Sequence, residues 1–197
     1  MSLNLLAISA SPSATSSSAR LADHVLELCA LDPSVRLSHL RLSELDPRAL
    51  MFADDRDLGI SRAVKMVADA DGIILVTPIY KASFTGLLKC FLDLLPQFAL
   101  VGKAVLPLAT GGSLAHALAL DYGLRPVLQS MGARHVVQAL LILQSHMTTD
   151  DMGLLKIEAH TESMLQHAID HFAWATRCDP ETRALGHPDP IRLTAGE

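Results

Sequence analysis

The strongest constraint on the fold is an alternation, repeated five times, between short apolar runs and longer segments with helical spacing. The clearest run is residues 72–77, which contains four consecutive aliphatic residues at 73–76. A strand that is apolar on both sides is typical of a parallel sheet covered by helices. The alternation therefore predicts an α/β fold. The predicted strands are residues 3–9, 35–42, 72–77, 104–110 and 136–143.

The segments between the predicted strands carry apolar residues at helical spacing. The predicted helices include residues 21–29, ending before Pro33, and residues 58–70, 86–95, 113–131 and 154–175. Residues 43–56 are polar and irregular and are expected to form a long connection. The economical arrangement of five such units is a flavodoxin-like three-layer sandwich, with a five-stranded parallel sheet of order 2-1-3-4-5 and helices on both faces.

Two further expectations concern the limits of the elements. Pro107 lies inside a predicted strand, which requires a bulge or a position whose N–H is free. Residues 1–176 are expected to form one domain. Residues 177–197 contain three prolines and no periodicity, which predicts a loose C-terminal tail.

Charge and composition exclude several classes of protein. The chain has 16 Lys and Arg against 21 Asp and Glu, a formal net charge of −5, so it lacks the positive field that nucleic acid requires. The basic residues are scattered, and no apolar run reaches the length of a membrane helix, so no membrane partner is expected. Three cysteines and no basic leader segment favour the cytoplasm.

Three loops are expected at one edge of the sheet, because the carboxyl ends of parallel strands are where open sheets bind ligands. The first loop, residues 9–18, is rich in hydroxyls and opens a helix whose free N–H groups suit a phosphate. It matches neither a Walker loop nor a GxGxxG turn, so a plain serine-rich turn remains an alternative. Its hydroxyl residues are Ser9, Ser11, Ser13, Thr15, Ser16, Ser17 and Ser18.

The second and third loops supply different chemistry. Residues 77–86 offer a stiff entry at Pro78, a flat surface at Tyr80 and a positive charge at Lys81. In residues 110–113, two glycines allow the backbone to approach a ligand closely, and Ser113 can cap the helix that follows. Together the loops suit a planar heterocycle that gains negative charge on reduction and carries a phosphate, although each loop alone is also an ordinary turn.

At these residues the chain resembles the NADPH-dependent FMN reductases, most closely the reductase of two-component alkanesulfonate monooxygenase systems. The resemblance covers roughly residues 3–143 and is densest over residues 71–132. The residues that carry it are Thr77-Pro78-Ile79-Tyr80-Lys81-Ala82-Ser83-Phe84, Gly86, Lys89, Asp93, Leu106-Pro107-Leu108-Ala109-Thr110-Gly111-Gly112-Ser113, Ala115-His116, Asp121-Tyr122 and Arg125-Pro126-Val127-Leu128.

The resemblance implies a flavin site built from all three loops. It implies that Ser11, Ser16 and Ser18 hold the FMN phosphate, with Ser9 and Ser17 as further candidates. It also implies that one side of the isoalloxazine ring is lined by Pro78, Ile79, Tyr80, Lys81 and Ser83, and the other side by Thr110, Gly111, Gly112 and Ser113. The family usually has Arg where this chain has Ser13, and the first loop is shorter. Both differences argue against tight retention of FMN.

The implied activity is NAD(P)H-dependent FMN reduction, in which NADPH or NADH donates a hydride to the flavin. Reduced FMN would then pass to a partner monooxygenase of sulfonate-type sulfur assimilation. No catalytic acid or base is required, and Lys81 is expected to offset charge that develops near flavin N1 and O2. The alternatives are a quinone or azo reductase with tightly bound FMN and a flavodoxin-like electron carrier.

The predicted helix 113–131 contains Gly123 and Pro126, which should produce a kink or a π-bulge near Tyr122. In the alkanesulfonate-type reductases the equivalent tyrosine marks a π-helix at a tetramer interface, so the resemblance implies a homodimer or homotetramer with Tyr122 near the interface. His167 and His171 share a helix face, but two ligands do not make a zinc site, and no metal site is predicted.

Overall fold

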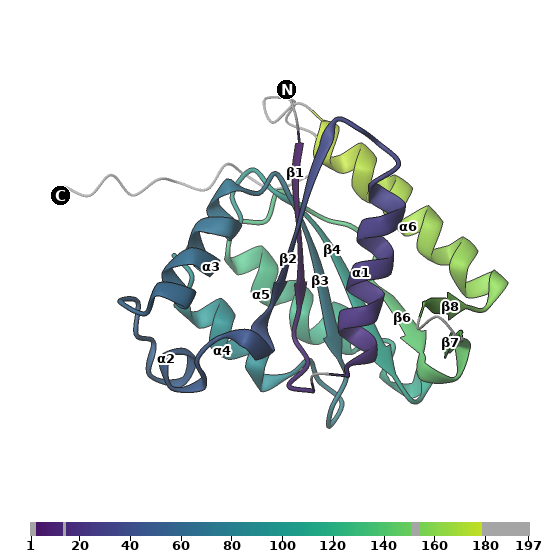
Figure 1. Ribbon diagram of the computed structural model, residues 1–197, viewed down its shortest axis with the longest axis horizontal. Helices are drawn as coiled ribbons and strands as arrows, with labels where there is room; N and C mark the ends of the chain where they lie inside the picture. Colours follow the sequence, from purple (N-terminus) through teal and green to yellow (C-terminus); the bar gives the residue numbers. More distant parts are fainter. Residues whose placement is uncertain (1–2, 14, 151–153, 179–197) are drawn as a thin grey trace.

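A computed structural model describes residues 3–13, 15–150 and 154–178. These residues form the expected flavodoxin-like sandwich, in which a parallel sheet lies between two layers of helices (Figure 1). The sheet order is β2-β1-β3-β4-β5, and β6 also pairs with β4. The strands are β1 (Leu3–Ser9), β2 (Val35–Arg41), β3 (Gly72–Pro78), β4 (Ala104–Gly111), β5 (His135–Val136) and β6 (Leu140–Leu143).

The helices cover the two faces of the sheet unequally (Figure 1). Two helices lie on one face, α1 (Ser17–Cys29) and α6 (Ala159–Arg177). Four lie on the other face, α2 (Pro47–Phe52), α3 (Leu58–Asp69), α4 (Gly86–Leu94) and α5 (Arg125–Ser130).

Alternate residues of the central strands enter two separate cores. In β1, Leu6 and Ile8 pack in the core of α3 and α4, whereas Leu5 and Ala7 pack in the core of α1 and α6. All of β3 is buried, as its unbroken apolar run predicts. Each aliphatic side chain buried in this way contributes about 1.5–3 kcal/mol relative to an exposed one. The sheet is therefore covered on both faces, and its parallel strands end together at one carboxyl edge.

The connection predicted at residues 43–56 is not irregular throughout. It contains a 3₁₀ turn, η1 (Leu42–Glu44), and the short helix α2. Asp46 caps α2 by accepting a hydrogen bond from the Ala49 N–H at 2.8 Å, and Pro47 occupies the first turn. Both residues favour a helix start, so the proline begins a helix here and does not interrupt one.

The predicted fifth strand, residues 136–143, is divided into β5 and β6, which pair with successive parts of β4. This division accommodates Pro107. The Val105 carbonyl accepts from Val137 N–H, so Val105 faces β5, and Pro107, two residues on, faces the same side. On that side β4 pairs with β5 up to Val105 and with β6 from Leu108, so Pro107 has no paired residue there. The missing N–H of the proline is therefore tolerated.

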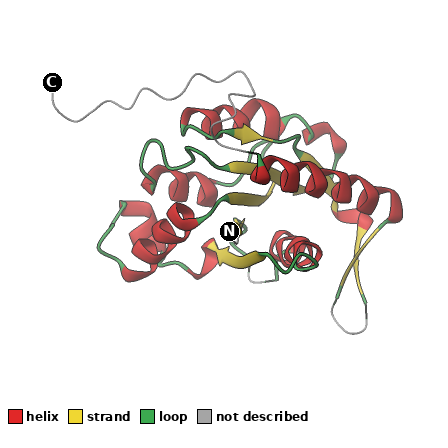
Figure 2. Cartoon of the chain, turned by 90° about the horizontal axis from the view of Figure 1, so that it is seen from above, coloured by secondary structure: helices red, strands yellow, loops and turns green. Residues whose placement is uncertain are grey.

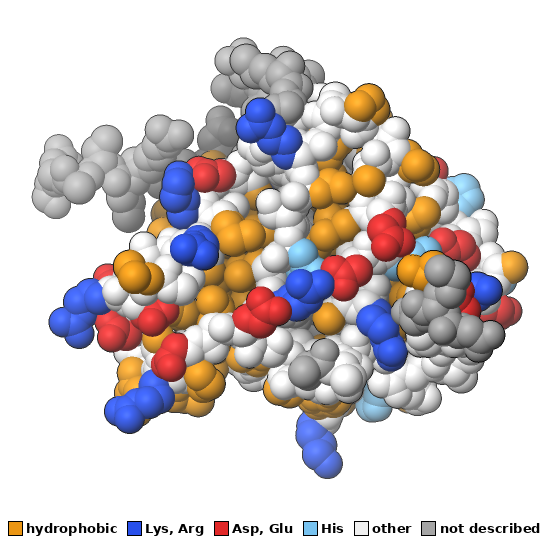
Figure 3. All heavy atoms as spheres, viewed as in Figure 1, with side chains coloured by type: hydrophobic (Ala, Val, Ile, Leu, Met, Phe, Trp, Pro, Cys, Tyr) orange, Lys and Arg blue, Asp and Glu red, His pale blue; other side chains and the backbone are white. Residues whose placement is uncertain are grey.

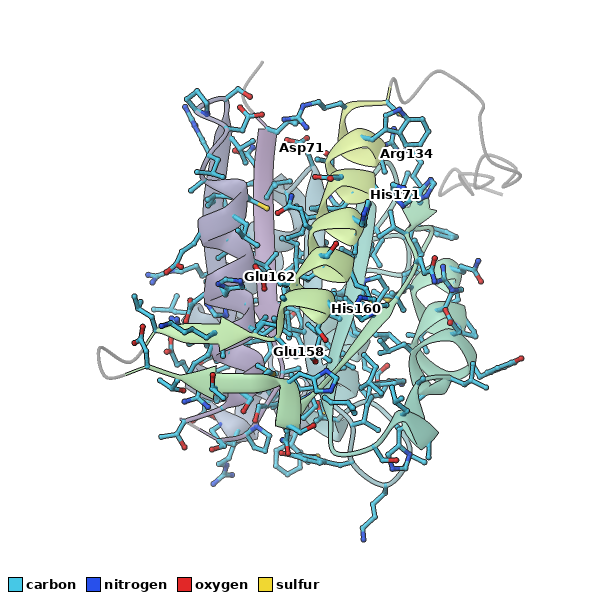
Figure 4. The ribbon with its side chains drawn as sticks, turned by 90° about the vertical axis from the view of Figure 1, so that its right-hand side faces the viewer. Asp71, Arg134, Glu158, His160, Glu162 and His171 are labelled. Atoms are coloured by element: carbon cyan, nitrogen blue, oxygen red, sulfur yellow. The ribbon has the colours of Figure 1, made fainter. Side chains whose placement is uncertain are left out.

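The predicted last helix begins later than expected. Leu155–Ile157 is a strand, β8, which pairs antiparallel with β7 (Met147–Thr149) in a ribbon that projects from the body (Figure 2). The helix α6 begins at Ala159. At its other end the guanidinium of Arg134 donates to the carbonyls of Ala175 and Cys178 (Figure 4). The tail expected at residues 177–197 lies outside the described residues from 179 on.

The helix predicted at residues 113–131 is three successive pieces. A 3₁₀ turn, η2 (Leu114–His116), is followed by a π-helix, η3 (Leu120–Leu124), and then by α5. The Arg125 N–H donates to the Leu120 carbonyl, the i to i+5 pattern of a π-helix. The expected π-bulge is therefore confirmed, and Tyr122 lies at its centre. Among the described residues no helix is both long and apolar enough to cross a membrane.

Candidate functional site

Hydrogen bonds join the three predicted loops at the carboxyl edge of the sheet, the lower edge in Figure 1. The Ile79 N–H donates to the Thr110 carbonyl at 2.9 Å, which joins the second loop to the third. The Ser18 and Thr110 hydroxyls lie 2.8 Å apart, which joins the first loop to the third. Thr85 donates through Oγ1 to the Ala10 carbonyl at 2.7 Å, which joins the second loop to the first. The three loops therefore form one surface.

In the first loop, serine hydroxyls also shape the backbone. Ser16 caps α1, with Oγ accepting from the N–H groups of Ser18 and Ala19 at 3.1 and 3.4 Å. Ser11 Oγ accepts from Ser13 N–H at 3.2 Å, which closes a local turn. Ser17 is half-buried, and its hydroxyl lies 3.4 Å from the Arg20 guanidinium. The loop thus presents hydroxyls and backbone N–H groups and no acidic side chain.

The second loop closes in a tight turn from Tyr80 to Ser83. Each of these two residues donates its N–H to the carbonyl of the other, at 3.0 and 3.1 Å. The residues between them, Lys81 and Ala82, have φ of 51° and 62°, which is strained backbone for residues with a Cβ. Lys81 is exposed and Tyr80 is 51% exposed. The turn therefore presents an aromatic ring and a cation away from the core.

Pro78 and Ile79 are buried, and Ile79 packs in the core of α3 and α4. Thr77 Oγ1 accepts from the Thr85 N–H at 3.2 Å and holds the two ends of the second loop together. These buried residues thus hold in place the ends of the loop that carries Tyr80 and Lys81.

The third loop leaves open space above Gly112. A Cβ built on Gly112 would meet nothing within 4 Å, whereas one on Gly111 would lie 3.1 Å from Leu141 Cδ1. A side chain at residue 111 would have to displace the end of Leu141 by a few tenths of an ångström, whereas Gly112 leaves room for another molecule. Ser113 caps η2 by accepting from the Ala115 N–H at 3.1 Å, so it begins a 3₁₀ turn and not the long helix expected.

The π-helix η3 packs against the second loop. A Cβ on Gly123 would lie 3.8 Å from the Phe84 ring and 4.0 Å from Ser83 Oγ. The other side of η3 is exposed, with Tyr122 78% accessible. Arg125 fixes this segment, because its guanidinium donates to the Val136 and Val137 carbonyls at 2.6 and 3.1 Å.

Sequence reasoning missed a polar chain beneath the first loop. Ser9 Oγ lies 2.9 Å from His39 Nε2, and His39 Nδ1 lies 2.7 Å from Asp23 Oδ1. Burial and the Arg41 charge lower the pKa of His39, although the Asp23 carboxylate opposes the shift. The available signal was the alternation in β2, which places His39 on the same side as Leu37, a residue packed against the core of α1 and α6.

These residues fit FMN. A phosphate needs donors, and the first loop offers hydroxyls and N–H groups at the start of α1 without a carboxylate. A flat ring needs space and an aromatic or backbone surface, and the loop glycine and Tyr80 provide both. Among the described residues no group of three or more His, Cys, Asp or Glu could hold a metal ion.

Comparison with known proteins gives a consistent result. The family described as NADPH-dependent FMN reductase matches residues 3–147. An FMN reductase (NADPH) of Escherichia coli is 40% identical over 139 residues, which is 70% of this chain and 72% of the relative. The NADH-dependent FMN reductase SfnE of Pseudomonas putida is 30% identical over 173 residues, 86% of this chain and 92% of the relative.

A solved structure, the apo form of an NADH:FMN oxidoreductase (EMOB), is 50% identical to this chain. It superposes with a TM-score of 0.85 and covers 96% of this chain and 98% of its own. With the loops joined at one edge and the family match across the whole sheet, the chain belongs to the NADPH-dependent FMN reductase family.

Proposed function

We propose that this protein transfers a hydride from NAD(P)H to FMN at the carboxyl edge of its sheet. The proposal rests on one observation, that hydrogen bonds join three loops of different chemistry. The first loop is rich in hydroxyls, the second is an aromatic turn, and the third contains a glycine with open space above it. When bound, FMN supplies the ring that accepts the hydride, so the protein contributes binding, orientation and electrostatics.

The proposed phosphate site is the first loop. We expect Ser9, Ser11, Ser16, Ser17 and Ser18 to bind the phosphate together with the first N–H groups of α1, where the helix dipole favours an anion. Ser16 and Ser18 act partly by fixing the loop, because their hydroxyls are already paired within the protein. The Ser16 oxygen only accepts within the protein, so its hydroxyl hydrogen stays available to a ligand. Ser18 keeps its own hydroxyl hydrogen for a ligand when the Thr110 hydroxyl donates to it.

The proposed ring site lies between the second and third loops. Tyr80, Ser83 and the backbone of Pro78 and Ile79 line one side, and residues 110–113 line the other. The strained turn holds Lys81 in the exposed position that its proposed role requires, which is to offset the negative charge that grows on the ring during reduction. No acid or base among the side chains is needed for this step.

We also propose that reduced FMN leaves to a partner monooxygenase of a two-component system. The first loop contains no Lys or Arg, and Ser13 stands where the resembling reductases usually carry Arg. A neutral cradle holds a phosphate dianion less firmly than a bidentate guanidinium does. Release of the flavin is therefore favoured over permanent retention. The cytoplasm, where NAD(P)H is abundant, is the proposed location.

Subunit association is a further part of the proposal. Tyr122, Leu114 and Leu118 are all exposed large apolar or aromatic residues on the π-helix and the turn before it. Exposed apolar groups gathered on one segment are typical of an interface. A homodimer or homotetramer with Tyr122 at the interface would cover them.

The test is oxidation of NADPH and of NADH by the purified protein, measured with and without added FMN. The expected result is that added FMN is required and is consumed in equal amount when oxygen is absent. If flavin neither copurifies with the protein nor alters the rate, the proposed function is wrong. Tightly bound FMN that turns over with a quinone or azo dye would instead favour a flavin-retaining reductase.

A further inference from the structure

A chain of three polar side chains links α1, β2 and β1 at the start of the first loop, with Asp23 at its half-exposed end and His39 and Ser9 buried. Asp23 Oδ1, His39 and Ser9 Oγ follow one another at 2.7 and 2.9 Å. The His39 side chain is only 8% exposed, and Ser9 is 3% exposed. These three groups are held in a fixed order at the base of the proposed phosphate loop. A change in the protonation of His39 can therefore alter the hydrogen bonds that Ser9 makes.

The Asp23 carboxylate determines which nitrogen of His39 carries a hydrogen. Its two oxygens lie 2.8 and 2.9 Å from Arg41 Nη2, and a carboxylate paired in this way can only accept hydrogen bonds. His39 Nδ1 must therefore donate to Asp23. In the neutral ring Nε2 has only a lone pair, so the Ser9 hydroxyl donates to it. Ser9 then directs lone pairs alone toward the loop.

Protonation of His39 reverses the role of Ser9. With a hydrogen on both ring nitrogens, Nε2 donates to Ser9 Oγ and the hydroxyl hydrogen of Ser9 is free to donate elsewhere. The terminal oxygens of a phosphomonoester dianion are acceptors only. A phosphate in the loop therefore binds more favourably to the state in which His39 is protonated, and selects that state.

We propose that His39 is a positioning residue that couples the binding of the FMN phosphate to the uptake of a proton, by turning the Ser9 hydroxyl toward the phosphate. This inference rests on the proposed function, because it requires the phosphate to lie in the first loop. The proton comes from solvent and forms an N–H bond at His39 Nε2, and no other covalent bond changes. Asp23 and Arg41 line a cavity of about 510 Å³, which gives the Asp23 end of the chain contact with water.

The charges around His39 are consistent with a neutral ring before the ligand binds. Burial and the Arg41 guanidinium lower its pKa, and the carboxylates of Asp23 on α1 and Glu44 on η1 act in the opposite direction. Arg20, His24 and Glu27 of α1 also line the cavity. Figure 3 shows acidic, basic and histidine side chains side by side over β2 and α1 at the centre of this face. A bound dianion adds the negative charge that favours the protonated ring.

The experiment is calorimetric titration of the full-length, flavin-free protein with FMN at pH 7.5, in buffers of different ionisation enthalpy. The dependence of the observed heat on the buffer gives the number of protons taken up. We expect uptake approaching about one proton for the unaltered protein and close to none for His39→Gln. Riboflavin, which lacks the phosphate, should bind without this uptake.

Two further variants separate the relay from a structural role of His39. Ser9→Ala keeps the buried histidine but removes the hydroxyl that links it to the phosphate, so proton uptake should fall well below that of the unaltered protein. His24→Gln alters a histidine of α1 that pairs with Glu162 and not with Ser9, and should leave the uptake unchanged. Circular dichroism checks that each variant is folded. If His39→Gln does not fold, Ser9→Ala alone tests the relay.

The outcomes of these titrations test the relay separately from the proposed reductase function. Equal proton uptake in the unaltered protein, His39→Gln and Ser9→Ala, with FMN still bound, overturns the relay and leaves the reductase proposal intact. If riboflavin binding takes up the same number of protons as FMN binding, the link to phosphate is wrong. If neither flavin binds, the proposed function fails and the relay fails with it.

Discussion

The Ser18 hydroxyl lies 2.8 Å from the Thr110 hydroxyl, and this bond joins the first turn of α1 to the end of β4. Both side chains are buried, and the two residues are 92 positions apart in the chain. Two of the proposed flavin-binding loops are therefore held at a fixed separation by one bond. A change at either residue should alter both stability and flavin affinity.

Ser18→Ala removes one partner and leaves the buried Thr110 hydroxyl unpaired, which should lower the free energy of unfolding by about 1–3 kcal/mol. Urea unfolding measures this change. The double variant Ser18→Ala with Thr110→Val removes both polar groups and should be less destabilised than the sum of the single variants. Strict additivity of the two single changes would contradict a direct bond.

Ser13→Arg should tighten the binding of FMN, because it adds a charge-assisted donor to a loop that has no cation. A charged hydrogen bond contributes about 1.5–3 kcal/mol, so Kd should fall by about tenfold or more. Flavin fluorescence quenching measures it. Ser61→Arg, on the exposed side of α3, is the matched control. Equal tightening for riboflavin would show that the new arginine does not contact the phosphate.

Ala82→Gly should relieve the positive φ of 62° and raise the stability of the fold by roughly 0.5–1 kcal/mol. It should also raise the KM for FMN, because a glycine turn holds Tyr80 less rigidly. Ala53→Gly is the control, since Ala53 has a φ of 51° at the end of α2, outside the proposed site. It should gain similar stability with KM unchanged. A KM that responds equally to both changes would argue against a role of the turn in flavin binding.

Tyr122→Ala should weaken subunit association, since it removes a large side chain that is exposed in the single chain. Light scattering after size exclusion measures the molar mass. Trp174→Ala, an exposed aromatic residue on α6, should leave the mass unchanged. A monomer at all concentrations for the unaltered protein would exclude the proposed assembly.

Cys29 should resist alkylation, because burial raises the pKa of its thiol to about 11. The thiolate, which is the reactive form, is then a minor species at pH 8, and its fraction grows about tenfold per pH unit until the pH approaches that pKa. Mass spectrometry after brief iodoacetamide treatment measures labelling at each cysteine, with the urea-unfolded protein as control. Full labelling of Cys29 in the folded protein at pH 8 would contradict this environment.

The sheet could be predicted from sequence because its signal is local. Four consecutive aliphatic residues at 73–76 identify β3 as central without any knowledge of its neighbours. The π-helix could also be predicted, since Pro126 and Gly123 act on the same turn. In contrast, the polar pattern around Pro47 predicts an irregular connection, although Asp46 and Pro47 together form a helix start.

The Asp23–His39–Ser9 chain could not be predicted, because it depends on how β2 aligns with β1. A shift of one residue in that pairing would turn His39 to the opposite face. The division between β5 and β6 has a similar cause, since it depends on which side of β4 lacks a partner at Pro107. Both features depend on which residues of neighbouring strands pair with one another, and the local preferences of single residues do not determine that pairing.

The wide turn at residues 120–124 holds one residue more per turn than a regular helix. Its outward side carries a tyrosine open to other molecules, and its inward side rests on the phenylalanine that follows the Tyr80–Ser83 turn. A subunit bound at Tyr122, as proposed, would be separated from the proposed ring-binding turn by a single helix. If both proposals hold, subunit association at this helix should change the affinity for FMN, and dilution of the protein should measure that change.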